Sequence, residues 1–445
     1  MEVCSPVAGL LPASEDEVVY AVQSAAKAGE QLKVVGAGHS FSGIQLTDGN
    51  QTSPGGRVMS LDLLSGITDV RYLDDGSGDA EVTALAGTRL RDLNSALEAR
   101  GLAFENLGAC AAQSLAGAVA TATHGTGRDL GSLSTQLRGL RVLDAAGAAH
   151  DIRGDDPATA DLFAASQVGL GALGVVMTAT VHVVPLFKMR KTTFTMPLDE
   201  FLGQHDAFYA NYSRFQWSWV PYSGTATVML REVTDDPVTG CWGDGEDDDE
   251  EAEENEAAAT ANANVKAKAA VGASNHYTDT TECVDVSYKT LVDSNSAYPE
   301  RTLYTEMEMF VPVEDAVAAV TAFIAYQDGV RGEFESMMAA QNDTTTALYS
   351  QVRYVKADDI PLSPMRGRDV AVLSMIVEGD EDATGSAGAV ELFSRDGVSG
   401  SFFLLGGLCK CSSLMFLFLA FFLLIFCTSS ASHFTLCNLF LSCHP

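Results

Sequence analysis

A glycine-rich loop after an early β-type run carries the first residues that could do chemistry. Residues 32–35 have strand character, and the chain continues as Gly36, Ala37, Gly38, His39 and Ser40. Glycine tolerates positive φ and lets the backbone approach a ligand closely, so the N–H groups of such a loop suit a pyrophosphate. The loop lacks the third glycine of a GxGxxG fingerprint, and a purely structural turn is the alternative interpretation.

Two further stretches consist almost wholly of small residues. Residues 117–127 read Gly-Ala-Val-Ala-Thr-Ala-Thr-His-Gly-Thr-Gly, and residues 169–176 read Gly-Leu-Gly-Ala-Leu-Gly-Val-Val. A chain with so little bulk can lie flat against a large planar or phosphorylated ligand, to which hydroxyls and amides donate hydrogen bonds. Tight packing inside a core explains the same composition, so each stretch alone leaves both interpretations open.

Taken together, the motifs at 36–40, 122–127 and 171–175 resemble those of FAD-linked oxidases of the vanillyl-alcohol oxidase superfamily. Within it the chain is most similar to the aldonolactone oxidases, with the alditol oxidases as close relatives. The resemblance covers residues 12–185 in order and continues more thinly to 368. It implies an α+β protein of two domains, a PCMH-type FAD-binding domain over 1–187 and an α+β substrate domain over 188–396.

The resemblance also implies which residues hold the cofactor. The pyrophosphate of FAD would lie on the loop 36–40, and His39 would bond covalently to the flavin 8α-methyl group. The other residues expected to contact FAD are Gly117, Thr123, His124, Gly125, Gly174 and Val175. Without the resemblance, His39 is more simply a capping or solvent-facing residue, and His124 a satisfied core histidine. No metal site is expected.

Residues 351–364 are similar to the family's Glu-x-Arg strand and the loop that follows it. Oxidation of a C–H bond beside a hydroxyl sends a hydride to flavin N5 and leaves negative charge near N1, which a fixed cation stabilises. Arg353 matches the family's active-site arginine, and Gln351 stands where the family usually has Glu. Gln351 keeps an amide that can hold a hydroxyl but loses a proton acceptor. An arginine on a surface edge strand is the alternative for Arg353.

Capping and periodicity signals predict the elements that position these motifs. Ser14 and Glu17 have the form of a capping box, and apolar spacing predicts a helix up to Gly29. In the first domain we expect strands at 58–61, 81–86 and 175–184, helices at 90–100 and 161–168, and a hairpin of 137–143 with 150–153. In the second we expect strands at 215–220, 225–230, 301–312 and 351–354, and a helix at 313–326.

Composition limits the partners. With 27 basic and 59 acidic residues, the net charge of -32 argues against nucleic acid and anionic membrane surfaces and favours a small or neutral substrate. Much of this charge lies in 244–256, inside residues 235–274, which are expected to form a disordered insertion. The nine cysteines lack a repeated CxxC spacing, so neither a disulfide scaffold nor a zinc module is expected. With no signal peptide before Pro12, an intracellular, reducing compartment is the default.

Residues 397–445 form an atypical apolar tail rich in cysteine. The family's His-Trp-x-Lys motif beside the flavin is absent, so the substrate domain is expected to be C-terminally truncated. Translated noncoding sequence, such as a retained intron, explains the abrupt change in composition. The rival explanation is an anchor in a mitochondrial or endoplasmic reticulum membrane through 414–427, although a spanning helix needs roughly 20 apolar residues.

The chain is therefore predicted to be an FAD-dependent oxidoreductase. It would oxidise an aldono-1,4-lactone or a related polyol and pass the electrons to oxygen or another acceptor, in the biosynthesis of ascorbate or its analogues. The alternatives are an alditol oxidase and a flavin-binding protein without turnover, because Gln351 and the absent motif remove parts of the active site. A chain that does not fold fully is the third alternative.

Overall fold

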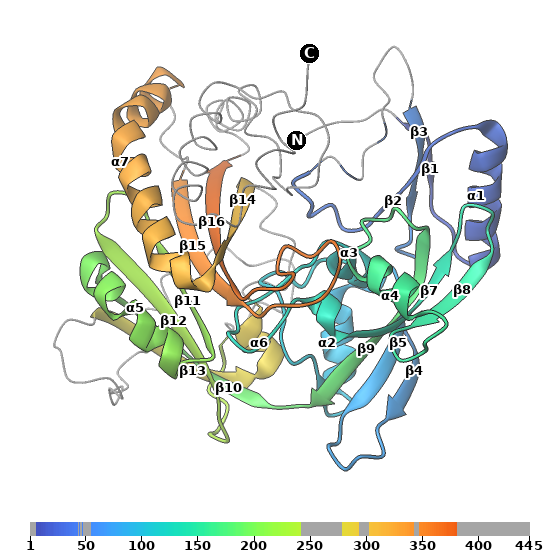
Figure 1. Ribbon diagram of the computed structural model, residues 1–445, viewed down its shortest axis with the longest axis horizontal. Helices are drawn as coiled ribbons and strands as arrows, with labels where there is room; N and C mark the ends of the chain where they lie inside the picture. Colours follow the sequence, from blue (N-terminus) through green and yellow to red (C-terminus); the bar gives the residue numbers. More distant parts are fainter. Residues whose placement is uncertain are drawn as a thin grey trace.

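The computed structural model of this protein describes residues 6–42, 44, 47, 55–241, 278–292, 302–341 and 347–380. Within these residues the strands form three sheets, two in residues 6–185 and one in residues 188–380 (Figure 1). We call these two parts of the chain the N-terminal unit and the C-terminal unit.

A small parallel sheet begins the N-terminal unit. In order it consists of β1 (Pro6–Leu10), β3 (Gly55–Ser60) and β2 (Leu32–Val35). Helix α1 (Glu15–Ala28) packs on it through Val18 and Met59. The Ser14 hydroxyl accepts a hydrogen bond from the N–H of Glu17 at 3.3 Å, and Gly29 ends the helix at φ 66°. Both predicted ends of this helix are confirmed, and β2 leads directly into the loop 36–40.

The second sheet of the N-terminal unit is antiparallel. In order it consists of β4 (Ile67–Tyr72), β5 (Ala80–Leu85), β9 (Val175–Pro185), β7 (Leu137–Leu143) and β8 (Ala149–Arg153), with β6 (Leu102–Ala103) paired to β9. It is accompanied by α2 (Leu90–Glu98), α3 (Leu115–Ala120), the 3-10 turn η2 (Leu133–Gln136) and α4 (Ala160–Gln167). Alternate residues of β9 are buried, as a half-buried strand requires.

The C-terminal unit is built on one sheet, which we call the large sheet. In order it consists of β13 (Thr278–Val286), β10 (Lys188–Pro197), β12 (Thr225–Val233), β11 (Arg214–Trp219), β15 (Ala347–Val355), β16 (Val370–Asp380) and β14 (Thr302–Pro312). Helices α5 (Leu198–Asn211) and α7 (Ala316–Gln341), the latter after the turn η3 (Val313–Asp315), lie on the side away from the N-terminal unit (Figure 1). Phe201 of α5 and Phe323 of α7 pack there in one core with Trp217 of β11.

The opposite face of the large sheet is polar where β14, β16 and β15 run side by side. Glu308 and Gln351 both pair with Ser374 of β16, while Arg353 pairs with Val372. Paired residues of an antiparallel sheet share a face, and so do alternate residues of one strand. Glu306, two residues before Glu308, therefore lies on this face as well.

Helix α6 (Ser287–Leu291) joins the two units. Tyr288 and Leu291 belong to the hydrophobic core of the N-terminal unit, and the Tyr288 hydroxyl donates a hydrogen bond to Glu98 of α2 at 2.8 Å. The two units therefore share part of one core, which fixes the polar face of the large sheet relative to the N-terminal unit.

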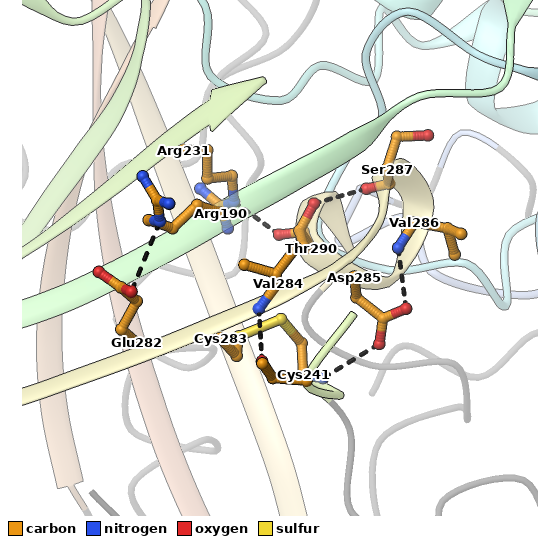
Figure 2. The surroundings of a disulfide bond; sticks show 11 residues. Arg190, Arg231, Cys241, Glu282, Cys283, Val284, Asp285, Val286, Ser287 and Thr290 are labelled. Carbon is orange, nitrogen blue, oxygen red and sulfur yellow. Dashed lines mark hydrogen bonds and ion pairs between the residues drawn. A yellow bond between two sulfur atoms is a disulfide. The ribbon is translucent and has the colours of Figure 1, made fainter. Parts of the chain in front are cut away.

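A disulfide joins Cys241 to Cys283 of β13, 42 residues apart (Figure 2). Beside it, the Cys241 N–H donates to Asp285 at 3.0 Å and the Val284 N–H donates to the Thr239 hydroxyl at 2.9 Å. This single bond is not the disulfide scaffold that the sequence argued against, and it was not predicted, because no spacing pattern marks a pair so far apart.

The disordered insertion was predicted to begin at residue 235, which is too early. Residues 235–241 are placed against the large sheet, where the Lys188 ammonium donates to the Asp235 carbonyl at 2.8 Å and the Thr239 N–H donates to the Val284 carbonyl at 2.9 Å. The rest of that insertion, 242–274, lies outside the described residues.

Some elements were not predicted. Helix α3 forms inside a stretch that was interpreted only as small residues, and α7 continues to Gln341 instead of ending at 326. The tail 397–445 lies outside the described residues, and with it the segment 414–427. Among the helices that the structure describes, none has the length and apolarity needed to cross a membrane.

Candidate active site

A cavity of about 870 Å³, which we call the cofactor cavity, lies in the N-terminal unit between the loop 36–40, α3 and the start of β9. Ligand pockets commonly have volumes of about 300–1,000 Å³, so the cavity has the size of a cofactor site. Of the residues predicted to hold FAD, it is lined by Gly36, Ala37, Gly38, His39, Ser40, Gly117, Gly174 and Val175. The structure thus brings together the loop 36–40 and parts of the small-residue stretches 117–127 and 169–176, which are far apart in the sequence.

Glycines make this cavity by letting backbone segments approach one another. A Cβ on Gly174, which has φ 138°, would lie 2.1 Å from the carbonyl oxygen of Leu143. A Cβ on Gly36 would lie 2.2 Å from the Ser114 hydroxyl, and Gly38 has φ 79°. Side chains would therefore close the cradle or strain its backbone, and the small residues present fit a bulky, phosphorylated cofactor such as FAD.

His39 lines the cofactor cavity and also a second cavity of about 200 Å³, which we call the charged cavity. In the part of the chain that the structure describes, its buried Nδ1 atom has no hydrogen-bond partner. Burial lowers the pKa of His39 against the opposing effect of the Ala37 backbone, and the positive charge of Arg89 lowers it further. The ring is therefore held in its neutral form, in which one nitrogen has a free lone pair.

The charged cavity lies between the two units. The N-terminal unit contributes His39, Thr123 and His124, and the polar face of the large sheet contributes Glu306, Glu308 and Arg353. Its walls combine one fixed cation, two carboxylates and two histidines. Such a set can hold the several hydroxyls of a small polar substrate beside the cofactor cavity.

Arg353 is oriented by neighbours on both units. Its Nε donates to Gln351 Oε1 at 2.8 Å, and its Nη1 lies 3.5 Å from the His124 carbonyl oxygen. Its Nη2 lies 3.7 Å from Glu306 Oε1 and 4.0 Å from Glu308 Oε1. The guanidinium is buried to 11% exposure, so its charge acts in a weakly screened environment.

Glu308 is the more strongly engaged of the two carboxylates. Its Oε2 lies 3.5 Å from His124 Nε2, and its Oε1 accepts a hydrogen bond from Ser374 at 3.2 Å. Burial acts to raise the pKa of Glu308, but His124 and Arg353 outweigh it and lower the pKa to about 2. Glu308 is therefore a carboxylate at neutral pH.

The pKa of Glu306 is shifted in the opposite direction. Burial, followed by the negative charge of Glu308, raises the pKa of Glu306 to about 7 against the opposing effect of Arg353. Sequence analysis missed both residues. The alternation Glu306-Met307-Glu308-Met309 within a predicted strand is the signal that places them on one face, but such a face is usually solvated.

Two predicted site residues line neither cavity. Gly125 is needed by the fold itself, since a Cβ there would lie 2.1 Å from the Leu107 carbonyl oxygen. Gln351 is buried beside Arg353 and acts on it through the hydrogen bond to Nε, while its own amide N–H donates to the Tyr349 hydroxyl at 3.2 Å. The structure thus places Gln351 behind Arg353.

Comparisons with known proteins agree with this geometry. Residues 6–153 match the family described as FAD binding domain, and residues 179–382 match the family described as D-arabinono-1,4-lactone oxidase. The chain is 30% identical over 382 residues to an L-gulono-1,4-lactone dehydrogenase of Mycobacterium tuberculosis, covering 84% of this chain and 80% of that protein. It is 34% identical over 236 residues to the L-gulonolactone oxidase of Bos taurus, covering 53% of this chain and 50% of that protein.

Solved structures confirm the fold. A cholesterol oxidase from B. sterolicum superimposes with a TM-score of 0.61 at 18% identity, covering 87% of this chain and 79% of that one. A 6-hydroxy-D-nicotine oxidase from Arthrobacter nicotinovorans superimposes with a TM-score of 0.60 at 17% identity, covering 89% and 80%. The predicted α+β, PCMH-type fold is therefore correct, and the chain belongs to the FAD-linked family of sugar-1,4-lactone oxidases and dehydrogenases.

Proposed function

We propose that this protein binds FAD in the cofactor cavity and oxidises an aldono-1,4-lactone in the charged cavity. The observation that carries the proposal is the position of His39, which lines both cavities and so places the end of the cofactor cavity beside the charged one. FAD would supply the acceptor for a hydride from the carbon next to a substrate hydroxyl.

The protein's own residues would bind and orient the lactone. Arg353 presents a buried cation that can hold a ring or hydroxyl oxygen and stabilise negative charge as it develops. Gln351 is a positioning residue, because it contacts Arg353 and lines neither cavity. Thr123 and His124 close the side of the charged cavity that faces the N-terminal unit, which helps to exclude water.

A covalent bond between His39 and the flavin belongs to the proposal. The unpartnered Nδ1 and the lowered pKa of His39 support it, since a neutral ring is the nucleophilic form. Oxygen as electron acceptor, a product that is ascorbate or an analogue, and membrane association through 414–427 complete the hypothesis. An alditol as substrate is the second candidate, because the charged cavity would also suit an open-chain polyol.

The test is an absorbance spectrum of purified protein before and after acid precipitation, for wild type and for His39→Ala. Flavin that stays with precipitated wild type and is released from His39→Ala supports FAD binding and the covalent bond. Flavin released from both proteins retains FAD binding and removes the covalent bond. A protein that neither carries nor takes up FAD contradicts the proposed function.

A further inference from the structure

The two carboxylates of the charged cavity, Glu306 and Glu308, differ in their hydrogen-bond and ion-pair partners. Glu308 is engaged through both oxygens, by His124 at 3.5 Å and by the Ser374 hydroxyl at 3.2 Å. Among the described residues, none donates a hydrogen bond to the buried Oε1 atom of Glu306, which lies 3.7 Å from Arg353 Nη2. A buried carboxylate oxygen that lacks a hydrogen bond is costly to the fold. Glu306 therefore calls for a role that involves a ligand.

We propose that Glu306 is a catalytic residue whose carboxylate accepts the proton of the substrate hydroxyl that is oxidised. This inference rests on the proposed function. In the step, the O–H bond breaks and its proton joins Glu306, while the adjacent C–H bond breaks and its hydride passes to FAD. The substrate loses two electrons and gains a C=O bond, and FAD is reduced. The proton leaves Glu306 for solvent before the next turnover.

The two groups that contact the carboxylates, His124 and Arg353, fit this task less well. His124 Nδ1 lies 2.9 Å from the carbonyl oxygen of Gly125 and must donate to it, and Nε2 faces Glu308. Arg353 remains a cation and cannot accept a proton. Among the described residues that line the charged cavity, Glu306 thus offers a carboxylate oxygen that no hydrogen bond occupies.

The surroundings of Glu306 also suit a base that works near neutral pH. The groups that face it are Glu308 on its own strand, Ser374 on β16, Arg353 on β15 and His124 from the N-terminal unit. Burial and Glu308 raise the pKa of Glu306 to about 7, and Arg353 favours its ionised form. A general base is most effective when its pKa lies near the working pH.

The inference is tested by mixing lactone anaerobically with FAD-loaded protein and following flavin absorbance from pH 5 to 9. For wild type, the limiting rate of flavin reduction should rise with pH through an apparent pKa near 7, because the carboxylate must be ionised to accept a proton. For Glu306→Gln, the rising limb should disappear and the rate at high pH should fall by about 10²-fold or more, the usual contribution of a general base.

Glu308→Gln is the matched control, because it removes the same charge from the same strand and the same cavity. Its rising limb should persist and move to lower pH, since the negative charge that raises the pKa of Glu306 is gone. The rate of flavin reduction by Glu306→Asp should still rise with pH, because aspartate also has a carboxylate. Lactone binding to each variant, measured from the perturbation of flavin absorbance under conditions without turnover, shows that the cavity is intact.

The outcomes separate the two proposals. If wild-type flavin binds but is never reduced by any aldonolactone or polyol, the proposed function fails and this inference fails with it. If wild-type flavin is reduced and Glu306→Gln reduces it equally fast with the same pH profile, only the inference is overturned. If the rise of the rate with pH is lost in Glu308→Gln and retained in Glu306→Gln, Glu308 is the base and the inference is also overturned.

Discussion

His124 of the N-terminal unit and Glu308 of β14 face each other across the boundary of the two units, with Nε2 3.5 Å from Oε2. The pair connects the loop beside the cofactor cavity to the polar face of the large sheet. Because Arg353 lies on the same face and its Nη1 approaches the His124 carbonyl oxygen, the charged cavity is defined by contacts between units. Its geometry therefore depends on how the units are joined.

Gly174→Ala should abolish flavin binding. A Cβ at this position would meet the Leu143 carbonyl oxygen at 2.1 Å, and φ 138° strains any residue with a side chain, so the wall of the cofactor cavity must shift. The ratio of flavin to protein after purification measures the effect. Gly203→Ala in α5 is the control, because nothing lies within 4 Å of its Cβ, and it should retain flavin. Full flavin content in Gly174→Ala would contradict the placement of FAD.

Gln351→Ala should lower kcat/KM for the lactone by about 10- to 100-fold, because Arg353 loses the acceptor of its Nε–H at 2.8 Å. Flavin content should stay unchanged, since Gln351 does not line the cofactor cavity. Tyr349→Phe removes the partner of the Gln351 amide but leaves the acceptor of Arg353 in place, and it should have a smaller effect. An unchanged kcat/KM in Gln351→Ala would show that Arg353 is held without it.

Cys241→Ala should lower the free energy of unfolding by about 2–4 kcal/mol, because the disulfide to Cys283 closes a long loop in the unfolded chain. Urea unfolding with and without reductant measures the difference. Reductant should destabilise wild type and leave Cys241→Ala unaffected. Cys110→Ala, which removes a free thiol, should keep the response to reductant. Peptide mapping that finds two free thiols in wild type would contradict the bond.

Tyr354→Phe should destabilise the C-terminal unit by about 1–3 kcal/mol. The Tyr354 hydroxyl is fully buried, accepts from Trp217 Nε1 at 3.0 Å and lies 2.6 Å from His205 Nε2, so its loss leaves both neighbours unsatisfied. Denaturant unfolding followed by tryptophan fluorescence measures the effect. Tyr20→Phe, at a side chain that is 75% exposed, should change little. Equal stability of the two variants would contradict a stabilising role for the hydrogen bonds of Tyr354 with Trp217 and His205.

Glu306→Gln should change how stability depends on pH. The folded-state pKa of Glu306 is raised from 4.5 to about 7, so its contribution is fully present below 4.5 and is lost as pH rises through 7. At about 1.4 kcal/mol per pKa unit, this loss is on the order of 3 kcal/mol at most. The stability of Glu306→Gln relative to wild type should therefore rise between pH 5 and 8.

Glu308→Gln should lower the free energy of unfolding, because the ionised Glu308 stabilises the fold at neutral pH. The pKa of Glu308 is lowered to about 2, so its contribution is present above 4.5 and is lost as pH falls toward 2. The variant should be less stable than wild type at pH 5, and the difference should narrow toward pH 8, because the loss of Glu308 also lowers the pKa of Glu306. Urea unfolding of both variants at several pH values measures these trends. A difference that is independent of pH for Glu306→Gln would contradict its raised pKa.

The sequence predicted the parts of the site that depend on local backbone chemistry. Ser14 and Gly29 mark the ends of α1 through capping. Gly38 and Gly174 mark the cofactor cavity, because both have positive φ and a Cβ on Gly174 would also meet the Leu143 carbonyl oxygen. The sequence could not predict how side chains meet across strands. Strands β14 and β15 both pair with β16, and this pairing places Arg353 of β15 on the same face as Glu306 and Glu308 of β14. All three residues line the charged cavity, which the sequence alone does not show.

Long-range pairs escaped prediction for the same reason. Cys241 and Cys283 are brought together because residues 239–241 contact β13, where the Thr239 N–H donates to the Val284 carbonyl at 2.9 Å, a contact that no local pattern encodes. Helix α3 was missed because Ala and Gly suit both a loop and a tightly packed helix, and burial of Leu115 and Val119 decides between them.

Flavin held in this chain should oxidise an aldonolactone. The most direct test is to add L-gulono-1,4-lactone, L-galactono-1,4-lactone or D-arabinono-1,4-lactone to the FAD-loaded protein without oxygen and record the flavin spectrum. We expect at least one lactone to bleach the flavin and an electron acceptor to restore the colour. A protein whose bound flavin stays oxidised with every lactone, while it still responds to a chemical reductant, would contradict this expectation.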